Sequence, residues 1–136
     1  MITGIAHVCY TTTDLDAASE FYCGQLGLRH AFDFVRPTGQ RYGVFLHVGG
    51  REFVELFEGR LDPPAERQRY RHLCLEVDDI QAAAADLRAK GLEVEGPAAA
   101  SDGGFNAWIH DPDGNRIELY QFTDASKQKP FFGEPA

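Results

Sequence analysis

The amino-acid sequence contains an internal duplication. The first half carries Ala6-His7-Val8-Cys9-Tyr10 and then Asp14-Leu15, and the second half carries Arg71-His72-Leu73-Cys74-Leu75 and then Asp79-Ile80. These signals keep an offset of 65 residues, and an acid between apolar residues follows in each half, with Glu118 63 residues after Glu55. Because half-units of this size are marginally stable alone, the duplication predicts two modules that pack together or pair across chains.

Strand, helix and turn signals follow the same order in both halves. Runs of alternating or β-branched residues predict strands at 5–10, 29–35, 42–48 and 51–57, and again at 70–77, 92–94, 105–110 and 116–122. Apolar residues at helical spacing after Asp14 and Asp79 predict helices over 15–26 and 79–90. The small and polar residues of 96–104 predict a mobile loop.

This element order predicts an α+β fold of two tandem βαβββ modules that form a curved mixed sheet around a cleft. We expect one domain over 1–122, with module 1 at about 4–57, a linker at 58–69, module 2 at about 70–122 and a tail at 123–136. The adjacent aromatics Phe131 and Phe132 in the tail predict docking on the body or on a second subunit.

Composition narrows the class of partner. The net charge of −8 disfavours nucleic acid and anionic membranes as partners. The apolar stretches are too short to span a bilayer, and residues 1–3 lead into the first strand without a basic leader. An odd count of three cysteines fits a reducing compartment, so we expect a cytoplasmic protein.

Strand alternation places four candidate ligands on one face. In each strand the apolar neighbours should face the helices, which turns His7, Glu55, His72 and Glu118 to the opposite face. A single histidine in a strand is more often structural, and a single glutamate usually faces solvent. One of each at equivalent places in both repeats instead indicates a divalent metal site for Ni, Co, Zn, Mn or Fe.

Other residues of the same strands are candidates for a substrate pocket. Cys9 and Cys74 share the alternation of the ligands, and nothing nearby in the sequence would activate their thiols. Phe45 and Trp108 could line the pocket, although aromatic strand residues usually serve packing.

The pattern resembles the vicinal oxygen chelate superfamily, which includes glyoxalase, bleomycin resistance and dioxygenase proteins, and within it glyoxalase I (lactoylglutathione lyase). The residues that carry the resemblance are His7, Phe21-Tyr22, Leu26-Gly27-Leu28, Glu55, His72 and Asp111-Pro112-Asp113-Gly114-Asn115 with Ile117-Glu118-Leu119. The resemblance implies a lyase or isomerase that holds one divalent metal per site with the His/Glu/His/Glu set. It also implies a homodimer in which His7 and Glu55 of one subunit meet His72 and Glu118 of the other.

The implied substrate is a hemithioacetal or related hydroxy-carbonyl compound, converted through an enediolate that the metal stabilises. Glu118 would be the catalytic base, with Glu55 as second choice. Members of this branch tend to carry an arginine near Thr11 that binds a glutathione carboxylate, whereas this chain has Tyr10-Thr11-Thr12-Thr13. A thiol adduct other than that of glutathione is therefore an open alternative.

Two other functions belong to the same superfamily. One alternative is a metal-free drug or natural-product binding protein of the bleomycin-resistance type. The other is an iron-dependent ring-cleaving dioxygenase, whose relatives use a His/His/Glu set and would leave Glu55 as a spare carboxylate.

Overall fold

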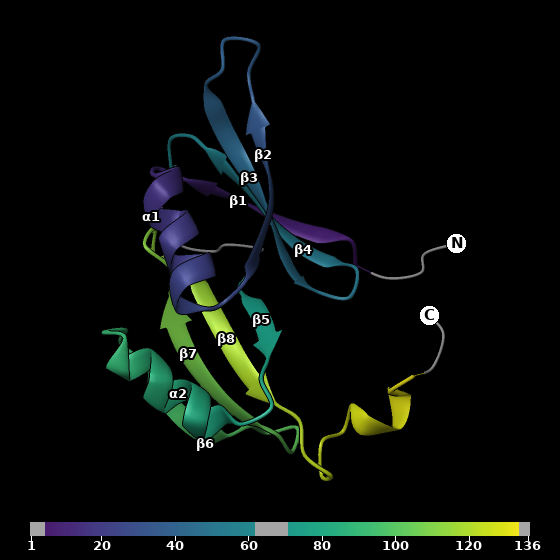
Figure 1. The fold of residues 1–136 in the computed structure, drawn as a ribbon. Helices are drawn as coiled ribbons and strands as arrows, with labels where there is room; N and C mark the ends of the chain where they lie inside the picture. Colours follow the sequence, from purple (N-terminus) through teal and green to yellow (C-terminus); the bar gives the residue numbers. More distant parts are fainter. Residues whose placement is uncertain (1–4, 62–70, 134–136) are drawn as a thin grey trace. The chain divides into compact units, whose positions relative to one another are not determined.

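The computed structural model describes residues 5–61 and 71–133 (Figure 1). The chain divides into two compact units, Met1–Arg67 and Gln68–Ala136. Most of the predicted linker, the predicted module starts at residues 4 and 70, and the last three residues of the tail lie outside the described residues.

Unit 1 is a four-stranded mixed sheet with its helical segment on one face (Figure 1). Its elements are β1 (His7–Thr12), α1 (Leu15–Ser19), the π-helical η1 (Glu20–Gln25), β2 (Arg29–Val35), β3 (Arg41–Gly49) and β4 (Glu52–Glu58). The strand order is β1-β4-β3-β2, in which β1 pairs with β4 in parallel and the other pairs are antiparallel.

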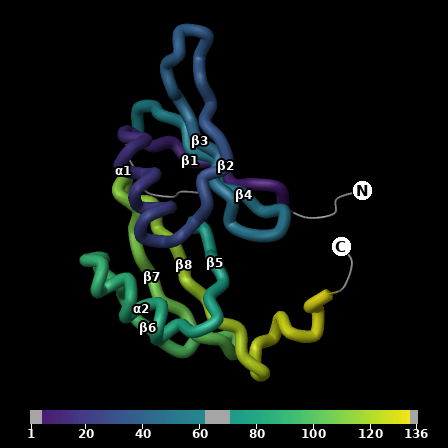
Figure 2. Tube along the Cα trace, in the orientation of Figure 1, coloured from purple at the N-terminus to yellow at the C-terminus, as the bar shows by residue number. Residues whose placement is uncertain are grey.

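Unit 2 repeats this arrangement. Its elements are β5 (Leu73–Glu76), α2 (Ile80–Ala89), β6 (Glu95–Ala99), β7 (Phe105–His110), β8 (Arg116–Gln121) and the 3₁₀ helix η2 (Lys129–Phe131). The strand order is β5-β8-β7-β6, again with one parallel pair, β5 and β8. Figure 2 follows the chain from β8 into the C-terminal segment, which is drawn in yellow.

The core of each unit lies between its sheet and its helix. Val54 and Leu56 in β4, and Ile117 and Leu119 in β8, are 0–3% exposed. Helix α1 contacts β3 and β4, and α2 contacts β6, β7 and β8. The alternation predicted for these strands is therefore present, since the apolar residues on both sides of each glutamate face the helix layer.

The structure confirms the α+β class and the two tandem modules, and it corrects three local predictions. The strand expected at 92–94 is wrong, because the edge strand β6 begins at Glu95. The mobile loop expected at 96–104 is wrong for its first residues, since Glu95–Ala99 pair with β7. Gly96 and Pro97 are unfavourable in strands, so the sequence does not indicate β6. An edge strand tolerates a proline, because the backbone on its outer side does not need an N–H group to pair with another strand.

The helix expected over 15–26 is continuous but not uniform. It is α-helical for Leu15–Ser19 and then widens into a π-helix over Glu20–Gln25, where Leu26 N–H donates to the Phe21 carbonyl. Apolar spacing alone does not distinguish these two helix types.

The C-terminal segment packs on unit 2. The Phe132 ring meets Phe122 edge-on with centroids 4.8 Å apart, whereas Phe131 is 69% exposed. Phe132 is also 51% exposed, so the docking predicted for the tail aromatics is limited to this one ring contact among the described residues. Among residues 5–61 and 71–133, no helix combines the length and apolar composition that crossing a bilayer requires.

Both helices start at an aspartate that caps the first turn. Asp79 accepts from the N–H groups of Gln81 and Ala82 at 3.0 and 2.9 Å, and Asp14 does the same in unit 1, with the N–H groups of Asp16 and Ala17.

We predict that Asp79→Ala lowers the free energy of unfolding by about 1 kcal/mol, because the N–H groups of Gln81 and Ala82 lose their hydrogen-bond acceptor. Urea denaturation followed by far-UV circular dichroism measures the change. The exposed Gln81→Ala is the control and should stay within about 0.5 kcal/mol. Equal unfolding midpoints for both variants would contradict the assignment.

Candidate metal centre

Each unit brings one histidine next to one glutamate on the face away from its helix. In unit 1, His7 Nε2 lies 3.7 Å from Glu55 Oε2, and in unit 2, His72 Nε2 lies 3.0 Å from Glu118 Oε2. The parallel strand pairs produce both contacts, because Glu55 stands opposite Cys9, and Glu118 opposite Cys74, two residues past each histidine. The glutamates are 16% and 14% exposed, so each pair is open on one side.

These separations suit adjacent ligands of one metal ion. Two donor atoms each about 2.1 Å from a metal and at right angles are about 3.0 Å apart, and about 3.4 Å in tetrahedral geometry. The His72–Glu118 pair has this spacing, and the His7–Glu55 pair needs a side-chain adjustment of a few tenths of an ångström. Imidazole nitrogen with carboxylate oxygen is a donor set that fits first-row divalent ions.

A single unit does not provide a complete set of ligands. Within residues 5–61 and 71–133, no group of three or more histidine, cysteine, aspartate or glutamate side chains gathers as a metal ion would require. The structure thus brings the four predicted ligands together as two pairs, one in each unit.

An aromatic ring supports each histidine. The Phe45 ring meets His7 edge-on with centroids 5.6 Å apart, and Trp108 meets His72 in the same way at 4.8 Å. Phe45 and Trp108 stand opposite Glu55 and Glu118 in their sheets, so they are equivalent residues of the repeat. Both residues were predicted as pocket candidates, and both orient a histidine.

The glutamates differ in one partner. Asn106 Nδ2 donates to Glu118 Oε1 at 2.8 Å, while Oε2 of the same carboxylate faces His72. The equivalent position in unit 1 is Gly43, which has no side chain to offer. Glu118 is therefore held at both oxygens.

The two cysteines of these strands are protonated at neutral pH in the metal-free protein. Burial, with a hydrogen bond to Glu55 and its charge, raises the pKa of Cys9 to about 11. Burial and the charge of Glu118 raise the pKa of Cys74 to about 12. A thiol that stays protonated is a poor nucleophile, so both cysteines serve as small neighbours of the carboxylates.

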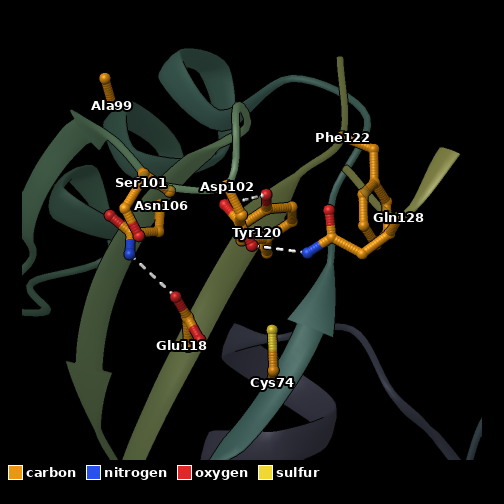
Figure 3. Close-up of a pocket in the computed structure, with 10 residues that line it drawn as sticks. Cys74, Ala99, Ser101, Asp102, Asn106, Glu118, Tyr120, Phe122 and Gln128 are labelled. Carbon is orange, nitrogen blue, oxygen red and sulfur yellow. Dashed lines mark hydrogen bonds between the residues drawn. The ribbon is translucent and has the colours of Figure 1, made fainter. Parts of the chain in front are cut away.

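A cavity of about 420 Å³ opens beside Glu118 within unit 2 (Figure 3). Its walls come from β5, the end of β6 with residues 100–102 after it, β7, β8 and the C-terminal segment. The lining residues are Cys74, Ala99, Ala100, Ser101, Asp102, Asn106, Glu118, Tyr120, Phe122 and Gln128.

Asp102 organises one wall of this cavity. The Tyr120 hydroxyl donates to Asp102 Oδ1 at 2.7 Å, and Gln128 Nε2 donates to Oδ2 at 2.5 Å (Figure 3). These two bonds hold the pKa of Asp102 below its usual range. Gly103 and Gly104 allow this close approach, because a Cβ at Gly103 would lie 2.2 Å from the Ala125 carbonyl oxygen and one at Gly104 2.2 Å from the Tyr120 hydroxyl.

Sequence reasoning placed each histidine and glutamate on the face away from the helices, their role as metal ligands stays a prediction, and most of the cavity was missed. Of the predicted pocket residues, Cys74 lines this cavity, whereas Cys9 and Phe45 belong to unit 1 and Trp108 lies against His72. Asn106, Asp102, Tyr120 and Gln128 were not predicted. Asn106 could have been found, since it shares the alternation of Trp108 two residues away.

Known proteins of several functions resemble this chain. A family model described as Glyoxalase/Bleomycin resistance protein/Dioxygenase superfamily matches residues 4–119. A lactoylglutathione lyase of Haemophilus influenzae is 30% identical over 86% of this chain and 91% of its own length. A 2-epi-5-epi-valiolone epimerase of an Actinomyces species is 32% identical over 85% of this chain and 77% of its own length. Among solved structures, the antibiotic binding protein TnmS3 of Streptomyces sp. CB03234 superposes with a TM-score of 0.73 at 28% identity, over 90% of this chain and 98% of the other.

The Asp102 wall allows a direct titration test. We predict that Tyr120→Phe raises the pKa of Asp102 toward the ordinary value of about 3.9, because one of the two bonds to the ionised carboxylate is lost. Carbon-13 NMR of the side-chain carboxyl measures this pKa. Asp124, whose pKa is lowered by Lys129 instead, is the internal control and should not move. An unchanged Asp102 titration would show that the tyrosine bond is absent in solution.

Proposed function

The chain belongs to the Glyoxalase/Bleomycin resistance protein/Dioxygenase superfamily, and on this basis we propose that it is a divalent-metal-dependent lyase or isomerase of the glyoxalase I type. Its substrate would be a hemithioacetal or related hydroxy-carbonyl compound. The observation that carries the proposal is the repeated His–Glu pair, with His72 and Glu118 at 3.0 Å and His7 and Glu55 at 3.7 Å. The similarity to the lactoylglutathione lyase supports the reaction class.

Both pairs together would hold one divalent ion, with His7 and Glu55 from one subunit of a homodimer and His72 and Glu118 from the other. When bound, the ion would act as a Lewis acid that favours negative charge on the substrate oxygens. Unit 2 would supply the substrate cavity, which adjoins Glu118.

Glu118 would move the proton. Its carboxylate would take a proton from the substrate carbon and return it to the neighbouring carbon. Asn106 supports this choice, because it would keep Glu118 Oε1 in place while Oε2 exchanges partners. Glu55 remains the second choice for the base, although Gly43 leaves it without an equivalent amide.

Glu118→Gln tests this assignment. We predict that the variant keeps part of its metal and loses proton transfer by about 10²–10⁴-fold, because an amide does not accept the proton. Elemental analysis measures the metal, and turnover and solvent-deuterium uptake are followed with the methylglyoxal–glutathione adduct and with adducts of other thiols. The matched control is Glu76→Gln, an exposed glutamate on the same face of β5, and it should behave as the wild type. Turnover near the wild-type rate in Glu118→Gln would refute the role.

A mixing experiment tests the shared site. His7→Ala and His72→Ala should each form dimers that lack a complete site. Random exchange makes half of the dimers mixed, and each mixed dimer has one intact site, so the mixture should regain about one quarter of the wild-type metal content. No recovery, or a monomer in light scattering at micromolar concentration, would count against the dimeric site.

A metal-free binding protein is the second candidate, favoured by two observations. One is the similarity to the antibiotic binding protein TnmS3. The other is the row of stacked rings beside His7, where the Phe45 ring lies 5.0 Å from Phe32 and 4.9 Å from Phe53. Protein that contains no metal as purified and takes up none of Ni²⁺, Co²⁺ or Zn²⁺ would favour this function.

A further inference from the structure

We propose that the cavity of unit 2 selects a neutral or cationic polyhydroxylated group and rejects a carboxylate. Under the proposed function, on which this identification of the substrate rests, the enzyme then acts on a small hydroxy-carbonyl compound and not on a glutathione adduct. The cavity volume of about 420 Å³ falls in the usual range for small-molecule sites, about 300–1,000 Å³.

Three side chains of the cavity wall donate to its own carboxylates. Asn106 donates to Glu118, and Tyr120 and Gln128 donate to Asp102. Each carboxylate oxygen can accept a second bond, whereas the tyrosine has no further hydrogen to donate. Asn106 and Gln128 each keep one amide hydrogen and Ser101 has its hydroxyl, but both charged groups of the wall only accept, which favours a ligand that donates to a carboxylate.

The orientation of the Gln128 side-chain amide is determined by Asp102. Because a carboxylate only accepts, the amide nitrogen of Gln128 has to face Asp102, and its oxygen is turned elsewhere. This oxygen, Oε1, is buried and receives no hydrogen bond from the described residues. A buried acceptor of this kind calls for a donor from a ligand or from water.

The negative charge of the cavity lining also favours a neutral or cationic ligand over a carboxylate. Its lining, as far as the described residues show, contains Asp102 and Glu118 and neither lysine nor arginine. Lys127 lies nearby, but its Nζ is exposed and contacts the Ser101 carbonyl at 3.4 Å. Under the proposed function the metal neutralises Glu118, and Asp102 keeps its charge.

A ligand carboxylate in this cavity would meet Asp102 as a like charge and would bring no proton for the free acceptors. A hydroxyl can donate to Asp102, and an ammonium group can also pair with the charge of Asp102. Glutathione brings two carboxylates and one ammonium group, so its adducts keep a net negative charge and fit this wall less well than a neutral or cationic group does.

Three sugars that differ only at carbon 6 test the preference. Glucose, 6-amino-6-deoxyglucose and glucuronate are titrated into nitrogen-15-labelled protein at constant ionic strength, and the amide shifts of residues 99–106 and 118–128 report the cavity. We expect the amino sugar to bind at least as tightly as glucose and glucuronate to bind at least tenfold more weakly. Glucuronate that binds as tightly as glucose, or shifts confined to other residues, would overturn the proposal, as would no binding by any of the three.

Substitutions of Asp102 and Gln128 test whether these residues cause the preference among the three sugars. Asp102→Asn should bring glucuronate and glucose to within about threefold of each other, and the exposed Asp124→Asn, which removes the partner of Lys129, should leave the difference unchanged. Gln128→Leu should weaken glucose binding and keep the order of the sugars, which provides a second measurement if Asp102→Asn disturbs the C-terminal segment. An unchanged order and spacing in Asp102→Asn would remove the basis of the proposal.

These titrations need no turnover, so they are independent of the metal and proton-transfer experiments. A sugar preference without metal uptake would refute the enzymatic proposal and keep the cavity proposal. Turnover of the glutathione adduct together with tight glucuronate binding would refute the cavity proposal and keep the enzymatic proposal.

Discussion

The parallel pairing of the first and last strands of each module is the constraint on which the candidate site depends. Parallel neighbours need a crossover connection, and here the helix and the intervening strands supply it. The crossover puts β1, which begins at His7, beside β4, which carries Glu55, and β5, which follows His72, beside β8, which carries Glu118. Burial of the apolar neighbours against the helix then turns both polar side chains to the open face. The His–Glu pair is thus a consequence of core packing and strand direction.

This dependence explains why the face on which these histidines and glutamates lie could be predicted from the sequence. Each glutamate stands between two apolar residues of its strand, which are Val54 and Leu56 for Glu55, and Ile117 and Leu119 for Glu118. Because these apolar residues must be buried against the helix, the glutamates have to lie on the opposite face of the sheet. The duplication supplied the second constraint, because a feature repeated at a constant offset is hard to attribute to chance. Strand β6 lacked both signals, since its residues Glu95–Ala99 are mostly small and its place at the sheet edge tolerates a proline.

The cavity could not be predicted for a different physical reason. Its wall joins the turn at Asp102 to Tyr120 in β8 and to Gln128 in the C-terminal segment, and no periodicity relates these three positions. The signal that existed was indirect: a Gly103-Gly104 pair where the backbone must pass close to Ala125 and to the Tyr120 hydroxyl. Two consecutive glycines indicate a close approach without indicating its partner.

The difference between the two modules comes from one coupled change. In unit 1, Gly43 stands opposite Phe57, and a Cβ at residue 43 would lie 2.4 Å from the Phe57 ring. In unit 2 the equivalent residues are Asn106 and Tyr120, and the tyrosine is bonded to Asp102 while the asparagine is bonded to Glu118. A side chain at position 43 would therefore require the Phe57 ring to move, whereas in unit 2 Asn106 and the Tyr120 ring are accommodated side by side. The same pair of positions provides the amide that anchors Glu118 and the hydroxyl that bonds to Asp102, so the asymmetry of the two carboxylates and part of the polarity of the cavity come from the same two residues.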